Sequence, residues 1–470
     1  MPERGEAAVG GKFLRLGAGE TLARGIAFLA TVYLARRLGA QAYGLIMVAT
    51  AILLYATAIV ESGIDTLGVH DVARDPGRLP ELLPGYLGVR LLVALGLLAA
   101  IVGAGLVVFP QPDGAILALY ALVLLPVSLG TRWAHLGLER SGTASLGRVV
   151  AEALAALVIV TAIHGPGDVV RAPLAPLLGE AAGAFLLLRL LPRGSDRMRL
   201  VLRLESAAAL LRRSWPVVAH TLLGLLIFNS DFFFLRGYHD AATVGYYAVA
   251  YTLVSFFLNL GSAYTLSLLP ALTRLREHPE REAGLYQGAM AQVFAGALPI
   301  AMGGSLLAGA LVQLVFGGSY APAGAPLRIL LWCIPVGLLR SVAHSALIAR
   351  GRQDQLLLSV AWAAGINLIL NFALIPRWGM TGAAIATVGT ETVRSALALR
   401  YCGRGGLRFP SLRRFWRVLL AGGLMGGILA LAGIGPLWLA IPVGGLVYLL
   451  GLYLLGGLSF RRGALPVLTV

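Results

Sequence analysis

The sequence predicts an all-α polytopic membrane protein with about fourteen transmembrane helices, arranged as two parallel-repeat lobes of six helices and two further C-terminal helices. Three observations support this prediction: the apolar composition, the regular recurrence of apolar segments and an internal repeat. Hydrophobic residues make up 58% of the chain, charged residues 13%, and the mean hydropathy is +0.82. Soluble domains contain roughly a quarter charged residues, so this composition excludes an ordinary soluble protein.

Apolar segments long enough to cross a bilayer follow one another with short breaks, since a hydrocarbon core of about 30 Å takes about 20 residues per helix. The first lobe is predicted over 1–191, with spans at 15–36, 42–64, 86–109, 114–136, 145–163 and 171–191. The second is predicted over 214–400, with spans at 214–236, 244–270, 290–313, 325–349, 355–375 and 379–400. A basic linker at 192–213 connects the two lobes. The C-terminal part, 401–470, consists of a basic loop and two extra spans, 415–433 and 437–457.

The formal net charge of +16 is distributed very unevenly between alternate loops. Arginines cluster in the loops on the side of the N-terminus, to which we assign Arg74, Arg78 and Arg90, and most densely at 189–213 and 400–417. The opposite side carries only Arg36, Arg37, Arg171, Arg236 and Arg377. This positive-inside pattern predicts a multi-pass protein of the bacterial cytoplasmic (inner) membrane with both termini in the cytoplasm. It also explains the excess charge without nucleic-acid binding, and we expect no nucleic-acid partner.

The first apolar stretch contains Arg24 and has no convincing small-residue cleavage site, so we expect no signal peptide. The two cysteines, Cys333 and Cys402, are predicted at different depths and give neither a disulfide framework nor a metal pattern. We therefore predict no metal site and no cofactor.

An internal repeat links the two predicted lobes. The stretch PVSLGTRWAHLGLERSG recurs without a gap as PVGLLRSVAHSALIARG, which aligns Pro126 with Pro335 and His135 with His344. Because each predicted lobe has an even number of spans, the copies run in the same direction through the membrane. Two-lobed transporters with a central cavity are built from such repeats.

Three arginines lie within predicted spans: Arg24, Arg132 and Arg340. An arginine at the centre of a spanning helix costs about 2.5–3.5 kcal/mol on insertion scales, so it needs a partner or water. Arg24 and Arg132 lie close enough to the cytoplasmic helix ends for their side chains to reach the interface instead. Arg340 lies deeper, and we predict that it lines a cavity.

The acidic residues of the spans divide into two groups. Arg148 and Glu152, and likewise Glu391 and Arg394, have the spacing of neutralising pairs on one helix. A second group lacks such a neighbour and is predicted either to bind a proton or sodium ion or to bond across helices: Glu61, Glu180 and Asp231. His220 lies three turns from Asp231 on one face, which suggests a proton-linked site, although a single histidine in a helix bundle is commonly structural.

Polar side chains follow one face of the predicted eighth span, where Tyr247, Tyr251, Ser255 and Asn259 recur at steps of four. Lipid is a poor neighbour for this face, so it is predicted to line a cavity in which tyrosines stack on sugar rings. A place in the interfacial aromatic belt is the alternative for tyrosines near a helix end.

The stretch NLILNFALIPRWGMTGAAIAT combines amides with small residues. Asn367 and Asn371 fall on one helical face, where we expect them to bond to a neighbouring helix rather than face lipid. Pro376 and Gly379 bound a minimal turn, and the small residues after it provide a surface for close helix packing. This stretch therefore predicts a packed helical hairpin.

The same stretch resembles the multidrug/oligosaccharidyl-lipid/polysaccharide (MOP) exporter superfamily, and within it the bacterial polysaccharide-transport flippases. Further resemblance lies in LARRLGAQAYGLIMVATAILLYATAIVESGIDTLGVHDVAR, DFFFLRGYHDAATVGYYAVAY and VFGGSYAPAGAPLRILLW. Together these motifs cover most of the first twelve predicted spans. Their order and spacing make the resemblance specific.

The resemblance implies two MATE-like six-helix bundles around a cavity. It also implies transport of an undecaprenyl-pyrophosphate-linked oligosaccharide of O-antigen or capsule type to the outer leaflet, in company with polysaccharide polymerase and export machinery. Arginine forks suit a pyrophosphate. Arg24 matches an early arginine of the related lipid II flippases, but their second arginine falls on Ala30 here, which favours a different glycolipid.

Three alternatives remain beside this prediction. A cation-coupled multidrug antiporter of the same superfamily would need a buried acid cluster, which the first span lacks. A polytopic polysaccharide-assembly enzyme would commonly carry catalytic residues on large external loops, whereas the predicted loops at 110–113, 164–170, 317–324 and 434–436 are short. A scaffold without transport activity is the third alternative.

Overall fold

The structure is a computed structural model, which describes residues 2–109, 111–192, 204–431, 436–459 and 467–468. The chain divides into two compact units, Met1–Phe232 (unit 1) and Phe233–Val470 (unit 2). The boundary falls inside a helix, so most of the seventh predicted span is grouped with unit 1. Each unit is described by itself.

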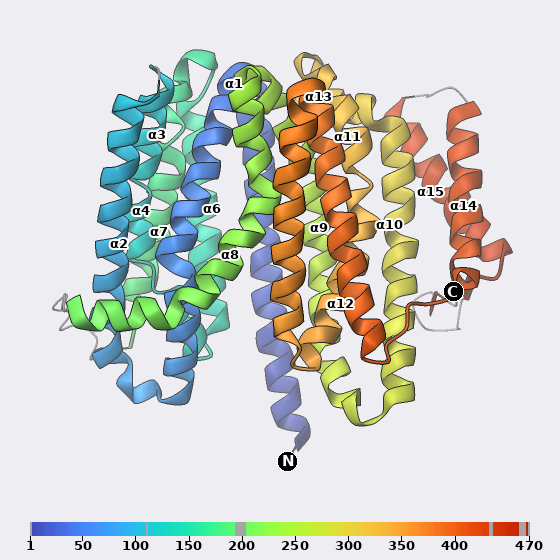
Figure 1. Cartoon of the computed structure of the whole chain (residues 1–470), viewed down its shortest axis with the longest axis horizontal. Helices are drawn as coiled ribbons and strands as arrows, with labels where there is room; N and C mark the ends of the chain where they lie inside the picture. Colours follow the sequence, from blue (N-terminus) through green and yellow to red (C-terminus); the bar gives the residue numbers. More distant parts are fainter. Residues whose placement is uncertain (1, 110, 193–203, 432–435, 460–466, 469–470) are drawn as a thin grey trace. The chain divides into compact units, whose positions relative to one another are not determined.

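Unit 1 is a bundle of helices that begins with one long, kinked helix (Figure 1). That helix bends at Gly39, whose φ of 73° is accessible to glycine at little cost, and so contains the first two predicted spans. The elements of unit 1 are α1 (Pro2–Arg74), η1 (Pro76–Arg78), α2 (Leu79–Val107), α3 (Asp113–Ala121), α4 (Leu124–Ser128), α5 (Arg132–Gly137), α6 (Ser141–Ala162), η2 (Pro166–Arg171), α7 (Leu174–Arg189) and most of α8 (Leu204–Tyr238).

Unit 2 repeats this plan and adds two helices and a short pair of strands (Figure 1). Its elements are α9 (Ala241–Arg274), η3 (Leu275–Glu277), α10 (Pro279–Phe316), η4 (Gly318–Ala323), α11 (Gly324–Leu330), α12 (Cys333–Ala349), α13 (Gln353–Arg404), α14 (Leu412–Leu431), α15 (Leu437–Leu454), β1 (Leu458–Ser459) and β2 (Val467–Leu468). The strands pair antiparallel over two residues each and were not predicted.

The predicted membrane fold is confirmed. Within the described residues, eleven helices are long and apolar enough to cross a membrane, and the bent stretch from Gly318 to Ala349 makes a twelfth. Because α1 and α13 each hold two spans around a kinked glycine, these twelve provide the fourteen predicted spans. The protein is a multi-span membrane protein.

The internal repeat is visible as a helix break at the same place in both units. Helix α3 ends at Ala121 and α4 begins at Leu124, while α11 ends at Leu330 and α12 begins at Cys333. The two breaks are separated by the same number of residues as Pro126 and Pro335. Each proline is the third residue of the helix after the break, where its missing N–H and its ring oppose a continuous helix. The predicted fourth and tenth spans, 114–136 and 325–349, each contain such a break.

The predicted linker at 192–213 is only partly described, because residues 193–203 lie outside the described residues. Residues 204–213 form the start of α8, which crosses the direction of the other unit 1 helices before it turns to run along them (Figure 1). Leu210 and Leu211 of this part pack on the apolar cluster around Leu79, Leu83 and Trp133. The apolar contacts explain why a basic stretch is helical here.

The hairpin predicted around Pro376 and Gly379 is confirmed. Helix α13 kinks at Gly379, which has a φ of 51°. A side chain at Gly382 would lie 2.5 Å from the carbonyl oxygen of Leu374, so the two arms pack at backbone distance. Asn371 Nδ2 donates to Asn367 Oδ1 at 3.1 Å, and Asn367 Nδ2 donates across the hairpin to Thr390 Oγ1 at 3.3 Å. Both asparagines are fully buried, as the packing interpretation predicts.

The last two helices, α14 and α15, pack on α10 through an apolar cluster that includes Val418, Met425 and Leu452. The hydroxyl of Tyr448 donates to the carbonyl oxygen of Ala295 at 2.6 Å and ties α15 to α10. These helices are therefore an integral layer of unit 2.

Candidate charged sites in the two units

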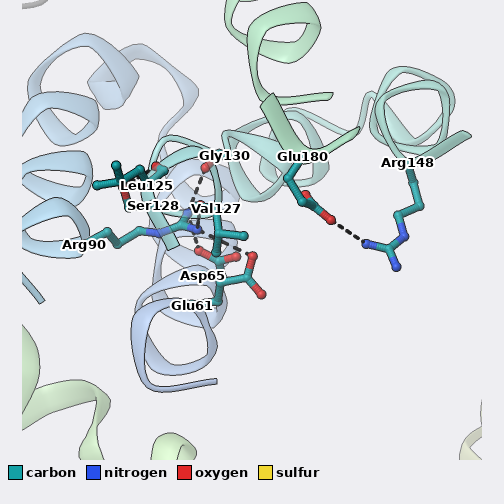
Figure 2. A network of polar contacts seen from close by, with 9 residues as sticks. All are labelled: Glu61, Asp65, Arg90, Leu125, Val127, Ser128, Gly130, Arg148 and Glu180. Carbon is teal, nitrogen blue, oxygen red and sulfur yellow. Dashed lines mark hydrogen bonds and ion pairs between the residues drawn. The ribbon is translucent and has the colours of Figure 1, made fainter. Parts of the chain in front are cut away.

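Among the described residues of unit 1, the most completely buried arginine is Arg90 of α2, which is 1% exposed (Figure 2). Its Nη1 donates to Asp65 Oδ1 and to the Gly130 carbonyl oxygen, both at 2.8 Å. Its Nη2 donates to the Val127 carbonyl oxygen at 2.6 Å and lies 3.7 Å from Glu61 Oε1. One guanidinium thus joins α2, two carboxylates of α1, and the stretch between α4 and α5.

A second arginine joins the next pair of helices in unit 1. Arg148 of α6 pairs with Glu152 on its own helix at 2.6 Å and with Glu180 of α7 at 3.3 Å. Figure 2 shows the Arg148 and Glu180 pair beside the Arg90 site. The charges of both residues act on Glu61.

A third arginine, Arg132 of α5, pairs with Glu20 of α1 at 2.5 Å and acts electrostatically on Asp65. These eight residues form three ion-pair groups that act on one another electrostatically, and we call them the acid-rich network: Glu20, Glu61, Asp65, Arg90, Arg132, Arg148, Glu152 and Glu180. Five carboxylates face three arginines, so the fully ionised network carries two negative charges in excess. An uncompensated charge is costly in a low-dielectric interior, so this network favours the binding of cations, protons included.

Unit 2 contains the opposite arrangement, in which one acid lies between two arginines. Arg340 Nε of α12 donates to Glu391 Oε2 at 2.9 Å, and Arg394 Nη1 donates to Glu391 Oε1 at 3.3 Å. The Glu391 side chain is 1% exposed and the Arg340 side chain 14%. We call these three residues the arginine triad. It carries one positive charge in excess, which favours an anion.

The sequence profile described as polysaccharide biosynthesis protein matches residues 10–276, more than half of the chain. The chain belongs to this family. The predicted resemblance is thereby confirmed.

A curated relative is the probable flippase AglR of Haloferax volcanii, which is 27% identical over 203 residues, 42% of this chain. The match spans 43% of the length of that relative. The fold is similar to that of the lipid II flippase MurJ in an inward closed conformation, with a TM-score of 0.80 at 12% identity over 94% of this chain and 98% of that one.

An inward-facing multidrug resistance MATE family transporter of the MOP superfamily is also similar, with a TM-score of 0.62 at 17% identity over 82% of this chain and 94% of that one. At these identities the structural likeness establishes the fold alone. The family member described here thus has the all-α fold of the MOP superfamily.

The three predicted arginines lie in different surroundings. Arg24 is exposed on α1, Arg132 is neutralised by Glu20, and Arg340 lies in the triad. The triad unites Arg340 with the predicted Glu391 and Arg394 pair, which spacing alone did not connect. Phosphate binding by these arginines stays a prediction.

Of the two roles predicted for Glu61 and Glu180, ion binding or contact across helices, the structure contains the contact across helices. Arg90 approaches Glu61 and Arg148 pairs with Glu180, in each case from another helix. Asp231 is buried in α8, and His220 is exposed on the same helix. Ion coupling through these four residues stays a prediction, and the described residues contain no group of three or more His, Cys, Asp or Glu arranged to hold a metal.

The predicted sugar-stacking residues differ in exposure. Tyr247 is fully buried, its hydroxyl is 2.9 Å from Thr387 Oγ1, and its ring stacks on Tyr251. Tyr251 is half-buried and Asn259 is exposed. The surroundings of Tyr247 are those of a packing residue, and substrate binding by the three residues stays a prediction.

Sequence reasoning missed Arg90 and Asp65, which form the centre of the acid-rich network. Arg90 was assigned to the basic loops of the topology pattern, and this assignment was wrong because the side chain is buried among three helices. One available signal was that Glu61 and Asp65 lie four residues apart, which places two carboxylates on the same helical face.

Proposed function

We propose that the protein is a flippase of the bacterial cytoplasmic membrane, with both termini in the cytoplasm. It moves an undecaprenyl-pyrophosphate-linked oligosaccharide to the outer leaflet by alternating access, for the assembly of a cell-surface polysaccharide. Family membership, the relative described as a probable flippase and the fold shared with a lipid II flippase support the proposal. Polymerase and export proteins would be its partners.

The arginine triad is the observation that carries this proposal. A pyrophosphate needs guanidinium groups that form paired hydrogen bonds. Glu391 neutralises only one of the two arginines, and Arg340 retains limited exposure. In a membrane-spanning unit, a partly accessible positive charge of this kind is expensive and is typical of a substrate pathway.

The test is leaflet translocation in proteoliposomes with a fluorescent undecaprenyl-pyrophosphate oligosaccharide and an external quencher. We expect transport by the wild type and its loss in Arg340→Ala, with partial recovery in Arg340→Lys, which restores charge without the fork. Arg328→Ala is the matched control, because Arg328 is an exposed arginine of α11 in the same unit. Normal transport by Arg340→Ala would contradict the proposed anion site.

A cation-coupled multidrug antiporter is the second candidate, and the acid-rich network of unit 1 is the observation that favours it. Cationic drugs and protons would both be attracted to its excess of carboxylates. If the wild type moves no lipid but exchanges a cationic dye for protons in the same vesicles, the antiporter replaces the flippase.

A further inference from the structure

The stretch between α4 and α5 interrupts the fourth span of unit 1 a second time. The N–H groups of Leu129 and Gly130 bond only three residues back, to Pro126 and Val127, and the next helix begins at Arg132. We call 129–131 the second break. Carbonyl groups at such a break need other donors, because lipid supplies none. Arg90 donates to the carbonyl oxygen of Gly130 in the break and, together with the Gly130 N–H, to that of Val127 at the end of α4.

The same guanidinium is also the cation that Glu61 and Asp65 share. Their side chains are 40% and 29% exposed, whereas Arg90 is 1% exposed. The carboxylates are therefore partly exposed at the surface of unit 1, while the arginine is confined between α1 and the break. When both carboxylates are ionised, they attract Arg90 toward α1. When they are protonated, this attraction falls and the two carbonyl groups remain its acceptors.

Charged groups on α1, α2, α5, α6 and α7 influence this balance. Glu61 faces Asp65 on α1, Arg90 on α2, Arg148 on α6 and Glu180 on α7. Asp65 faces Arg90 and, on α5, Arg132. Two of the arginines are already engaged, Arg132 by Glu20 and Arg148 by Glu152 and Glu180. Arg90 is thus the principal counter-ion of the Glu61 and Asp65 pair within the described part of unit 1.

We propose that Arg90 is a positioning residue that couples protonation of Glu61 and Asp65 to the second break in the fourth span. A proton from water binds a carboxylate oxygen, the guanidinium shifts its hydrogen bonds toward Val127 and Gly130, and the break tightens. Loss of the proton reverses these steps. The inference rests on the proposed function for its role in transport, since a break that opens and closes with protonation would link proton binding to the movement of unit 1.

Hydrogen exchange of the peptide covering 124–137 tests the coupling without any substrate. After correction for intrinsic rates, we expect the amides of Leu129, Gly130 and Ala134 to be about tenfold better protected at about pH 5 than at about pH 8. Asp65→Asn should show the high protection at both pH values. Glu81→Gln, an exposed carboxylate paired with Arg78 in the same unit, should behave like the wild type. Protection that is independent of pH in the wild type would overturn the proposal, and so would a pH response that persists in Asp65→Asn.

Transport of the fluorescent lipid provides the second measurement, made with internal and external pH varied together. We expect the wild-type rate to depend on pH and the dependence to vanish in Asp65→Asn and in Arg90→Lys, because an ammonium cannot reproduce the fixed fork. Arg78→Lys is the control that keeps the dependence. An unchanged pH profile in folded Arg90→Lys would overturn the proposal. If that variant does not fold, Asp65→Asn and the exchange measurement decide. If the wild type moves no lipid, the proposed function fails while the exchange result still decides the coupling.

Discussion

The fourth span of the chain, in unit 1, and the tenth, in unit 2, contain arginine sites at corresponding places but bring the arginine there by different routes. In unit 1 the helix is interrupted at Gly130 and Thr131, and Arg90 enters from α2 to bind the released carbonyl groups. In unit 2 the helix is continuous there, and Arg340 occupies the position aligned with Thr131. A continuous helix satisfies its own carbonyl groups, so Arg340 has its hydrogen bonds available for Glu391.

The comparison shows how one repeat acquires two opposite charge balances. In unit 1 one arginine is shared by two carboxylates, whereas in unit 2 one carboxylate is shared by two arginines. The first arrangement favours protons or other cations, and the second favours anions. Duplicated lobes can therefore divide ion coupling and substrate binding between them without a change of fold.

The largest expected effect is that of Arg90→Ala. It leaves two carboxylates without their principal counter-ion and removes the Arg90 hydrogen bonds to the Val127 and Gly130 carbonyl groups, so we expect the free energy of unfolding to fall by about 3–5 kcal/mol. Thermal unfolding in detergent measures the loss. Arg78→Ala removes an exposed arginine of the same unit and should have little effect. If Arg90→Ala and Arg78→Ala lose the same unfolding free energy, Arg90 is no more important for stability than an exposed arginine.

Arg340→Ala should destabilise the protein less than Arg90→Ala, by about 2 kcal/mol, which is the typical value of a hydrogen bond between charged groups. Glu391 keeps Arg394 as its partner, so no buried charge is left unpaired. The same unfolding measurement applies, with Arg328→Ala as control. A loss as large as that of Arg90→Ala would mean that the triad is as structural as the Arg90 site.

Tyr247→Phe should reduce stability by about 1 kcal/mol, because it removes the buried hydrogen bond to Thr387 and keeps the ring. Transport should persist if Tyr247 only packs unit 2. Tyr238→Phe, at an exposed tyrosine, is the matched control. Loss of transport in a stable Tyr247→Phe would instead support the predicted substrate role.

The smallest effect concerns the start of α9. Asp240 accepts hydrogen bonds from the Thr243 hydroxyl at 2.6 Å and the Thr243 N–H at 2.9 Å, which lower the pKa of Asp240. Asp240→Ala should cost about 1 kcal/mol at neutral pH, whereas Asp240→Asn, an equally good cap, should cost little. Because the folded pKa is lowered, the advantage over alanine is full above the ordinary pKa of about 4 and shrinks as pH falls through the folded value. If the difference in stability between the wild type and Asp240→Ala does not change across this pH range, the assignment of Asp240 as the helix cap is contradicted.

The sequence by itself predicted the class of protein, the spans, the repeat and the hairpin at Gly379. Each depends on local properties: the length of an apolar segment, the freedom of glycine and proline, and a match between two stretches of chain. It also predicted the charge pairs within one helix, Arg148 with Glu152 and Glu391 with Arg394, since helical spacing determines which side chains are neighbours.

Only the tertiary structure decided which charges meet across helices. Arg90 was assigned to a basic loop, yet it binds α1 and the second break, and Glu180 has a partner on α6. Arg340 joins Glu391 from a different helix. The rotation of one helix against another depends on the packing of all side chains between them. This rotation cannot be predicted from residue spacing along one helix. The opposite charge balance of the two units follows from that packing.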